Sequence, residues 1–226
     1  GFHVTSDMRN LNGRFVIPPI MSIDKSDCHY DVLMPNMMFE NVTQWDYFVN
    51  NSIQISNHIP IESRISKGFW RGKYHPGSIE RVKLVSLGKS KYLEVGFTEI
   101  LYGTYREFVN NHTSNELNIS KKNIQKVSSL NKYQIASYKV HIIMPGGFGR
   151  TYTKVFQYWL PLCSMPIFLE NSYYQFFTDE LCRYIQCIFV NETTVIPTVK
   201  KLVNDDQYLR KMSRNVENFV RNYLSS

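Results

Sequence analysis

The sequence predicts an α/β fold in which a parallel sheet carries helices on both faces. From about residue 64 onward, short β-branched or aromatic runs alternate with segments of helical periodicity. This order is typical of parallel strands joined by crossover helices. The 226 residues are 43% hydrophobic and 14% aromatic, enough to bury the core that such a fold needs, so intrinsic disorder is excluded as the overall class.

The N-terminal sixty residues are expected to be largely irregular, because prolines interrupt them and apolar runs are short. Isolated strands are predicted at 15–17 and 32–34. One helix is predicted over 44–55, where large apolar residues recur at helical spacing; they are Trp45, Phe48, Val49 and Ile53.

The first strand–helix unit of the sheet follows residue 64. A short buried strand over 68–72 is expected to end in a glycine turn, and a helix over 78–87 has Ser78 as a plausible N-cap. The next strand is predicted at 92–97. Residues 110–131 are polar and are expected to form a connection.

The clearest unit begins with a β-branched strand over 138–144, which runs into a glycine-rich turn and a helix over 151–162. A strand at 165–169, a helix at 173–181 and a strand at 187–190 are expected next. Two helices close the chain, and the last carries an apolar stripe typical of a helix docked on a core; its residues are Leu209, Met212, Val216, Phe219, Val220 and Tyr223.

The net charge of the chain indicates which class of ligand it binds. The chain has 26 Lys and Arg against 19 Asp and Glu, a net charge of +7, which favours anionic ligands. The basic residues are scattered instead of forming a dense stripe, so a local phosphate site is expected and nucleic-acid binding is not. No apolar run approaches the ~20 residues of a membrane span, and no signal peptide is visible.

The four cysteines, Cys28, Cys163, Cys182 and Cys187, fit no zinc spacing and are too few for a disulfide scaffold. We expect small, buried thiols in a reducing compartment. This favours the cytoplasm, with the lumen of the endoplasmic reticulum or Golgi as the alternative.

Ligands of open α/β sheets bind beyond the carboxyl ends of the strands, where helix N-termini present unpaired N–H groups. The turn over 146–151 occupies that position, and Arg150 and Lys154 would add charge for a diphosphate. Its spacing matches neither the dinucleotide fingerprint nor a P-loop. The alternative is a tight turn whose two cations are solvated.

A second basic spot lies at the preceding strand–helix junction, where Arg71 and Gly72 lie at the end of a strand and Arg81 lies in the first turns of the next helix. Surface charges are the alternative there, but two such junctions in one sheet favour a shared anion. No spacing isolates an acid–base pair of carboxylates. His141 lies inside an apolar strand, so we expect a buried structural histidine.

Several motifs, in this order, resemble the CAP10-like, Rumi-type family of protein O-glucosyltransferases and xylosyltransferases, over nearly the whole chain. The motifs are 19–25, 31–39, 69–72 (Phe-Trp-Arg-Gly), 80–81 (Glu-Arg), 94–99 (Glu-Val-Gly-Phe-Thr-Glu), 131–136 (Asn-Lys-Tyr-Gln-Ile-Ala), the glycine turn, 162–168 (Leu-Cys-Ser-Met-Pro-Ile-Phe), 173–177 and 204–206.

The resemblance implies a GT-B architecture, in which two Rossmann-like lobes face each other and no metal or other cofactor is required. Residues 1–60 would be a remnant or minimal N-terminal lobe on the acceptor side, and 61–226 the lobe that binds a UDP-sugar. Asp7 would be the general base. The donor-binding residues would be Arg71, Gly72, Arg81, Gly96, Phe97, Thr98, Gly147, Phe148, Gly149, Arg150, Thr151 and Lys154.

The chain departs from the family pattern in three places. A second phosphate arginine of the family is replaced by Phe156, so Arg150 or Lys154 would take its role. The family's disulfide partner for Cys163 is missing from 131–133, which points to a reducing compartment or a divergent homologue. The chain is also short, as expected of a fragment, one domain of a larger protein, or a minimal enzyme.

These observations predict a metal-independent glycosyltransferase that moves glucose or xylose from a UDP-sugar to a hydroxyl group of a protein or glycan, with inversion. The alternative is a non-catalytic binding or scaffolding domain that retains the fold. A third hypothesis, a binder of phosphate-rich polymers, would require a steep salt dependence of affinity.

Overall fold

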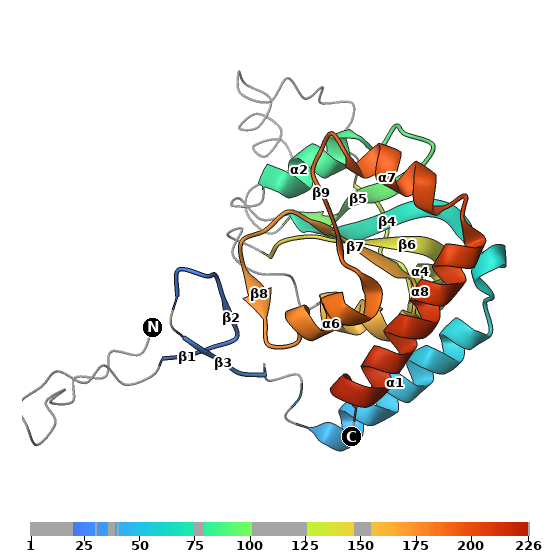
Figure 1. The fold of residues 1–226 in the computed structure, drawn as a ribbon. Coiled ribbons are helices and arrows are strands. Elements are labelled where there is room, and N and C mark those ends of the chain that lie inside the picture. Colours follow the sequence, from blue (N-terminus) through green and yellow to red (C-terminus); the bar gives the residue numbers. More distant parts are fainter. Residues whose placement is uncertain are drawn as a thin grey trace, which may run out of the picture.

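The computed structural model describes residues 20–29, 31–35, 39, 41–74, 79–100, 126–146 and 155–225. At its centre lies a five-stranded sheet with the order β5-β4-β6-β7-β9, in which every neighbouring pair is parallel (Figure 1). The α/β class predicted from the sequence is therefore confirmed. The strands are β4 (Ile65–Tyr74), β5 (Leu93–Ile100), β6 (Tyr138–Ile143), β7 (Met165–Leu169) and β9 (Ile188–Val190).

Helices cover both faces of this sheet, as expected (Figure 1). Helices α2 (Ile79–Ser86) and α7 (Val195–Leu202) lie on one face, and α1 (Val42–Asn57), α6 (Thr178–Ile185) and α8 (Asp206–Phe219) lie on the other. None of the helices in the described part of the chain has the length and apolar character needed to cross a membrane. The remaining helical segments are η2 (Ile61–Ser63), α4 (Lys132–Ala136), α5 (Val155–Trp159), η5 (Leu160–Leu162) and the π-helical η6 (Val220–Leu224).

Short strands in the segment before α1 take part in two separate two-stranded sheets. Strand β1 (Met21–Ser22) pairs in parallel with β3 (Val32–Leu33). Strand β2 (Asp24–Lys25) pairs antiparallel with β8 (Tyr174–Gln175), which follows the carboxyl end of β7. The β2–β8 pair therefore brings part of the N-terminal segment to the sheet's carboxyl edge, the edge at which the parallel strands end.

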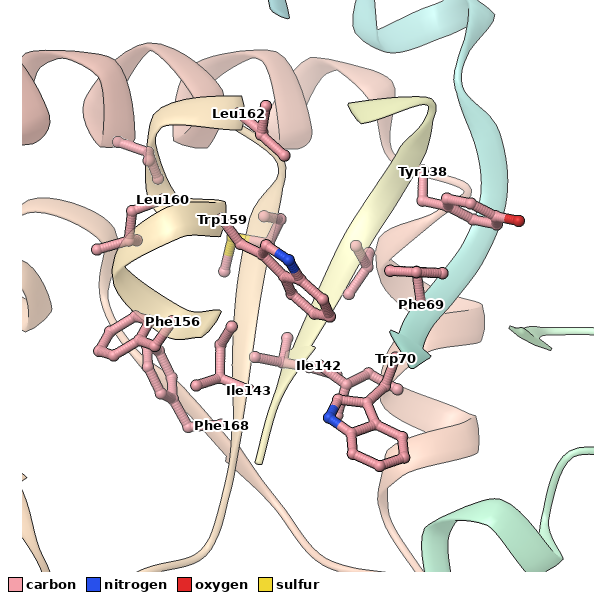
Figure 2. Packing of buried hydrophobic residues seen from close by; sticks show 14 of the residues in the cluster. Phe69, Trp70, Tyr138, Ile142, Ile143, Phe156, Trp159, Leu160, Leu162 and Phe168 are labelled. Atoms are coloured by element: carbon pink, nitrogen blue, oxygen red, sulfur yellow. The ribbon is translucent and has the colours of Figure 1, made fainter. Parts of the chain in front are cut away.

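One hydrophobic core connects α1 with the sheet. Phe69 of β4 stacks on Tyr138 of β6 with ring centroids 4.6 Å apart, and packs against Trp159 at 5.3 Å (Figure 2). Trp45 and Ile53 of α1 are buried in the same cluster. The division into 1–60 and 61–226 stays a prediction, but α1, which precedes residue 60, packs with the residues that follow it.

Two element boundaries differ from expectation. The strand predicted over 68–72 does not end in a glycine turn: β4 continues through Gly72 to Tyr74. The helix predicted over 173–181 is wrong at its start, because Tyr174 and Gln175 form β8 and α6 begins only at Thr178. The Gln175 N–H donates to Thr178 Oγ1 (3.0 Å), and pairing with β2 overrides the local helical spacing.

The cysteine prediction is wrong for one pair, because Cys182 of α6 and Cys187 before β9 form a disulfide. The turn between them is closed by Gln186, which ends α6 in a left-handed conformation with φ of 50°. Cys28 and Cys163 are free; Cys163 is buried as expected, and burial raises the pKa of its thiol to about 12, whereas Cys28 is exposed, contrary to expectation. Unpaired cysteines therefore no longer favour the cytoplasm.

Removing this disulfide is expected to lower the free energy of unfolding. Loop-closure entropy for so short a loop predicts a loss of about 2 kcal/mol for Cys182→Ser. Urea denaturation of the variant, and of the parent with and without reductant, measures it. Cys28→Ser, which removes an exposed free thiol, is the control and should leave the curve unchanged. Superimposable curves for parent and Cys182→Ser would contradict the prediction.

His141 is buried as the sequence predicts. Its ring lies 5.2 Å from that of Trp159, and Nε2 donates to the Ile135 carbonyl at 3.0 Å. Burial lowers the pKa of His141 to about 3, with the Ile135 carbonyl opposing the shift and the Arg64 charge adding to it. The imidazole is therefore neutral over the physiological range, which fits a structural role.

The depressed pKa of His141 predicts a loss of stability in acid. The unfolded chain takes up this proton near pH 6.5 and the folded chain only near pH 3. The free energy of unfolding is therefore unaffected by His141 above pH 6.5, and it falls by about 1.4 kcal/mol per pH unit between pH 6.5 and pH 3. Between pH 7 and pH 5 the histidine should therefore cost about 2 kcal/mol. Urea denaturation of the parent and of His141→Gln at both values measures the difference, and equal pH dependence of the two proteins would refute it.

Candidate functional site

The candidate site is the carboxyl edge of the sheet, where the sequence predicts a phosphate site. Strand β4 ends at Tyr74, shortly before α2, and β6 ends at Ile143, shortly before Pro145 and Gly146. The two strands are neighbours in the sheet, so their ends lie side by side. This arrangement places two strand–helix junctions next to each other, which is what a shared anion site requires.

Arg81 of α2 links these two junctions. Its Nη1 donates to the Lys73 carbonyl of β4 at 2.7 Å, and its Nε and Nη2 donate to the Pro145 carbonyl at 3.2 and 2.8 Å. Three of the five N–H groups of a guanidinium are thereby used, and the other two have no partner among the described residues. Arg81 thus faces the start of the glycine-rich turn.

The charge of Arg81 is not balanced by an ion pair with any carboxylate of the described part of the chain; Glu80 acts on it only at longer range. The side chain is 5% exposed. Burial lowers the pKa of Arg81 to about 10, with Glu80 opposing the shift, so the guanidinium stays protonated at neutral pH. A buried cation without a counter-charge is unfavourable, and an anion at this edge would relieve that cost.

Trp70 forms the floor beneath this arginine. The Arg81 guanidinium lies over the indole at 5.7 Å from the ring centroid. Phe97 of β5 meets the same indole edge-on at 5.9 Å. Trp70 and Phe97 are both buried, so they act on the site through Arg81. Trp70 is not among the site residues predicted from the sequence, although its position two residues before Gly72 places both on one face of the strand.

Arg71 is not brought together with Arg81. It follows Trp70 in β4 and therefore points to the opposite face of the sheet. There its Nη2 pairs with Glu94 at 2.8 Å and its Nη1 donates to the Ser128 carbonyl at 2.7 Å. Burial alone would raise the pKa of Glu94, but hydrogen bonds from Arg71 and Lys67 hold it below its ordinary value. Arg71 is thus engaged in an ion pair that joins β4 to β5.

The expected donor-binding residues Gly96, Phe97 and Thr98 lie in β5. Gly96 is covered by Val127: an added Cβ would stand 2.7 Å from Val127 Cγ2. The Val127 N–H also donates to the Phe97 carbonyl at 2.8 Å. Thr98 is half-buried at the carboxyl half of the strand. Within the described residues, Gly96 and Phe97 therefore serve packing, and contact with a nucleotide stays a prediction for them.

Several expected site residues lie outside the described residues, so their placement is not stated. Phe156, at the family's second arginine position, is buried between Phe168 and Phe177, each 5.3 Å away, and supplies no charge. In the part of the chain that is described, no cluster of His, Cys, Asp and Glu could hold a metal ion. The expected residues outside are Asp7, Gly147, Phe148, Gly149, Arg150, Thr151 and Lys154.

Comparison with protein families finds one model, described as "Glycosyl transferase family 90", that matches residues 3–226. A comparison with curated proteins finds no match.

Solved structures similar to this chain include two C-terminal domains of bacterial enzymes. The CMP-Kdo binding domain of WaaA from Acinetobacter baumannii is 10% identical with a TM-score of 0.44, over 78% of this chain and 99% of that one. The domain of the group 1 glycosyl transferase LpcC from Francisella tularensis is 12% identical with a TM-score of 0.45, over 81% and 97%. Similarity at this level says nothing about the ligand of this chain.

Proposed function

Since the chain belongs to glycosyl transferase family 90, we propose that it moves glucose or xylose from a UDP-sugar to a hydroxyl group of a protein or glycan. The observation that carries the choice of donor is the buried guanidinium of Arg81 at the carboxyl edge, which forms no ion pair with a carboxylate of the described residues. A UDP-sugar brings a diphosphate, which is the anion that such a cation would stabilise, together with the glycine-rich turn that the sequence predicts after Pro145.

The reaction that follows is a single displacement at the anomeric carbon. Asp7 takes the proton of the acceptor hydroxyl as its oxygen attacks, and the bond between the anomeric carbon and the diphosphate oxygen breaks. The electron pair of that bond leaves with UDP. Arg81 and the turn over 147–154 would balance the negative charge that develops on this oxygen, a role that donors fixed in advance perform best. Attack opposite to the leaving group inverts the anomeric carbon.

The proposal is tested by measuring UDP release with a panel of UDP-sugars and a hydroxyl acceptor. We expect release with UDP-glucose or UDP-xylose. Asp7→Asn should lower kcat by about 10²- to 10⁴-fold while the affinity for UDP is retained, because the base acts in the chemical step and not on the donor. Parent-like turnover in Asp7→Asn would refute the role of Asp7.

The competing function is a binding or scaffolding domain that keeps the fold without turnover. It is favoured if the parent binds UDP in calorimetry yet releases none from any UDP-sugar in the panel. The absence of UDP binding by the parent would overturn the choice of donor itself.

A further inference from the structure

We propose that Trp70 is a positioning residue for donor binding: seated on Gly72, its indole holds the Arg81 guanidinium where it can pair with the diphosphate. This inference rests on the proposed function, since it presumes that the carboxyl edge binds a diphosphate. It assigns a purpose to a buried aromatic side chain that has no atom available to the donor.

The first observation is the contact between Trp70 and Gly72. Both residues point to the α2 face of β4, since they are two positions apart in a strand. A Cβ added to Gly72 would stand 2.6 Å from Cζ2 of the indole and 3.2 Å from Cε2 and Cη2. The six-membered ring of Trp70 therefore occupies the space that a side chain at position 72 would need, and only glycine allows this placement.

The second observation is what else touches the ring. Phe97 meets the indole edge-on with ring planes at 89°, and Phe97 in turn packs edge-on against Tyr74 at 5.6 Å. The ring is thus held from β5 as well as from its own strand. Above it lies the Arg81 guanidinium. The aromatic side chains form a rigid floor, and Arg81 is the charged group that lies on it.

The Trp70 ring restricts the orientation of the Arg81 guanidinium in a way that its hydrogen bonds alone do not. The carbonyls of Lys73 and Pro145 accept hydrogen bonds from the guanidinium, and the indole, with its centroid 5.7 Å from Cζ, would limit how far that plane can tilt. A planar guanidinium pairs with phosphate through parallel N–H bonds, so its tilt decides whether both bonds form. A side chain ordered before binding also loses less freedom when the ligand arrives.

Packing alone would equally account for a buried tryptophan, so the test separates affinity from stability. UDP binding by calorimetry and thermal unfolding are measured for the intact chain and for four variants: Trp70→Phe, Gly72→Ala, the double variant Gly72→Ala/Trp70→Phe, and Gly68→Ala. Gly68→Ala is the matched control. Gly68 lies in the same strand and on the same face, but its added Cβ would crowd Val199 Cγ2 at 2.9 Å, remote from Arg81.

We expect Gly72→Ala to weaken UDP binding about threefold to thirtyfold, the range of a cation–π contact, because the new methyl group displaces the indole. Trp70→Phe should weaken it less, since a smaller ring remains. In the double variant the phenyl ring clears the methyl group, so its affinity should return to that of Trp70→Phe alone. Gly68→Ala should lower the unfolding temperature while UDP affinity stays at the parent value.

Two results would overturn the inference while the proposed function stands. One is parent-like UDP affinity in Gly72→Ala and Trp70→Phe at temperatures where all proteins are folded. The other is an equal loss of affinity in Gly68→Ala, which would show that general loosening of β4 is responsible. A parent chain that binds no UDP would instead overturn the proposed function, and the inference with it.

Discussion

Arg81→Ala is expected to weaken UDP binding about a hundredfold or more. The substitution removes the buried guanidinium that lies between the ends of β4 and β6, and with it charge-assisted hydrogen bonds to the diphosphate, which are each worth about 1.5–3 kcal/mol. It also leaves the Lys73 and Pro145 carbonyls without this donor, so the link between the end of β4 and Pro145 is lost. Isothermal titration of UDP into the parent and the variant measures the change.

Two further substitutions sharpen this test. Arg81→Lys retains the charge, but a single ammonium cannot hold both carbonyls and present a planar pair of donors, so an intermediate loss of about tenfold is expected. Lys83→Ala is the control: Lys83 lies two residues along the same helix, carries the same charge, and pairs with Glu192 at the surface. If Arg81→Ala binds UDP as tightly as the parent does, Arg81 only links β4 to Pro145 and does not bind the diphosphate.

Arg64→Ala is expected to lower the free energy of unfolding by about 3–5 kcal/mol. The Arg64 side chain is buried, and all of its N–H groups are donated within the fold. Removing these hydrogen bonds leaves several buried oxygen acceptors without a donor, and each costs about 1–3 kcal/mol of the free energy of unfolding. The acceptors are the Ile59 carbonyl (3.0 Å), the Leu162 carbonyl (3.2 Å), Ser164 Oγ (2.9 Å), the Ser56 carbonyl (3.1 Å) and Ser56 Oγ (2.7 Å).

These bonds join the end of α1 to the segment before β7, which explains the size of the expected loss. Arg64→Lys should recover little of it, since an ammonium on a longer stem cannot reach acceptors on several sides. Urea denaturation measures the free energies, with Arg214→Ala, an exposed arginine of α8, as a control expected to change stability by less than about 0.5 kcal/mol. An Arg64→Ala protein within 1 kcal/mol of the parent would contradict the prediction.

The elements that the sequence predicts well are those whose pattern is local. Strand β7 is found at its predicted bounds of 165–169, because it is a continuous apolar run, and β6 is found within one residue, because it is rich in β-branched residues. Helix α8 follows from its apolar stripe, whose members are buried except Tyr223. Strand β8 was missed because its partner, β2, lies about 150 residues earlier, and no spacing within 173–181 reports that pairing.

The disulfide was missed for a related reason. Cys182 and Cys187 are five residues apart, and they meet only because Gln186 adopts a left-handed conformation that turns the chain back at the end of α6. Glycine or asparagine at this position would have predicted a left-handed turn at the end of the helix, but glutamine does not. The pairing is a property of this turn and not of the cysteine spacing.

Part of the candidate site could be predicted and part could not. Arg81 follows from its place early in a helix after a strand, but its partners are main-chain carbonyls, which any sequence contains. Arg71 was grouped with it by proximity in the sequence, although alternation along a strand sends Arg71 to the other face. The same alternation would have paired Trp70 with Gly72, a relation that was available in the sequence.

The central claim is that the carboxyl edge binds a diphosphate around Arg81. It is tested most directly by titrating the intact chain with UDP, UMP and uridine, followed by competition with inorganic pyrophosphate. We predict affinities in the order UDP, UMP, uridine, and displacement of UDP by pyrophosphate, because each phosphate adds negative charge beside the same guanidinium. Equal affinities for uridine and UDP, or UDP that pyrophosphate cannot displace, would contradict the claim.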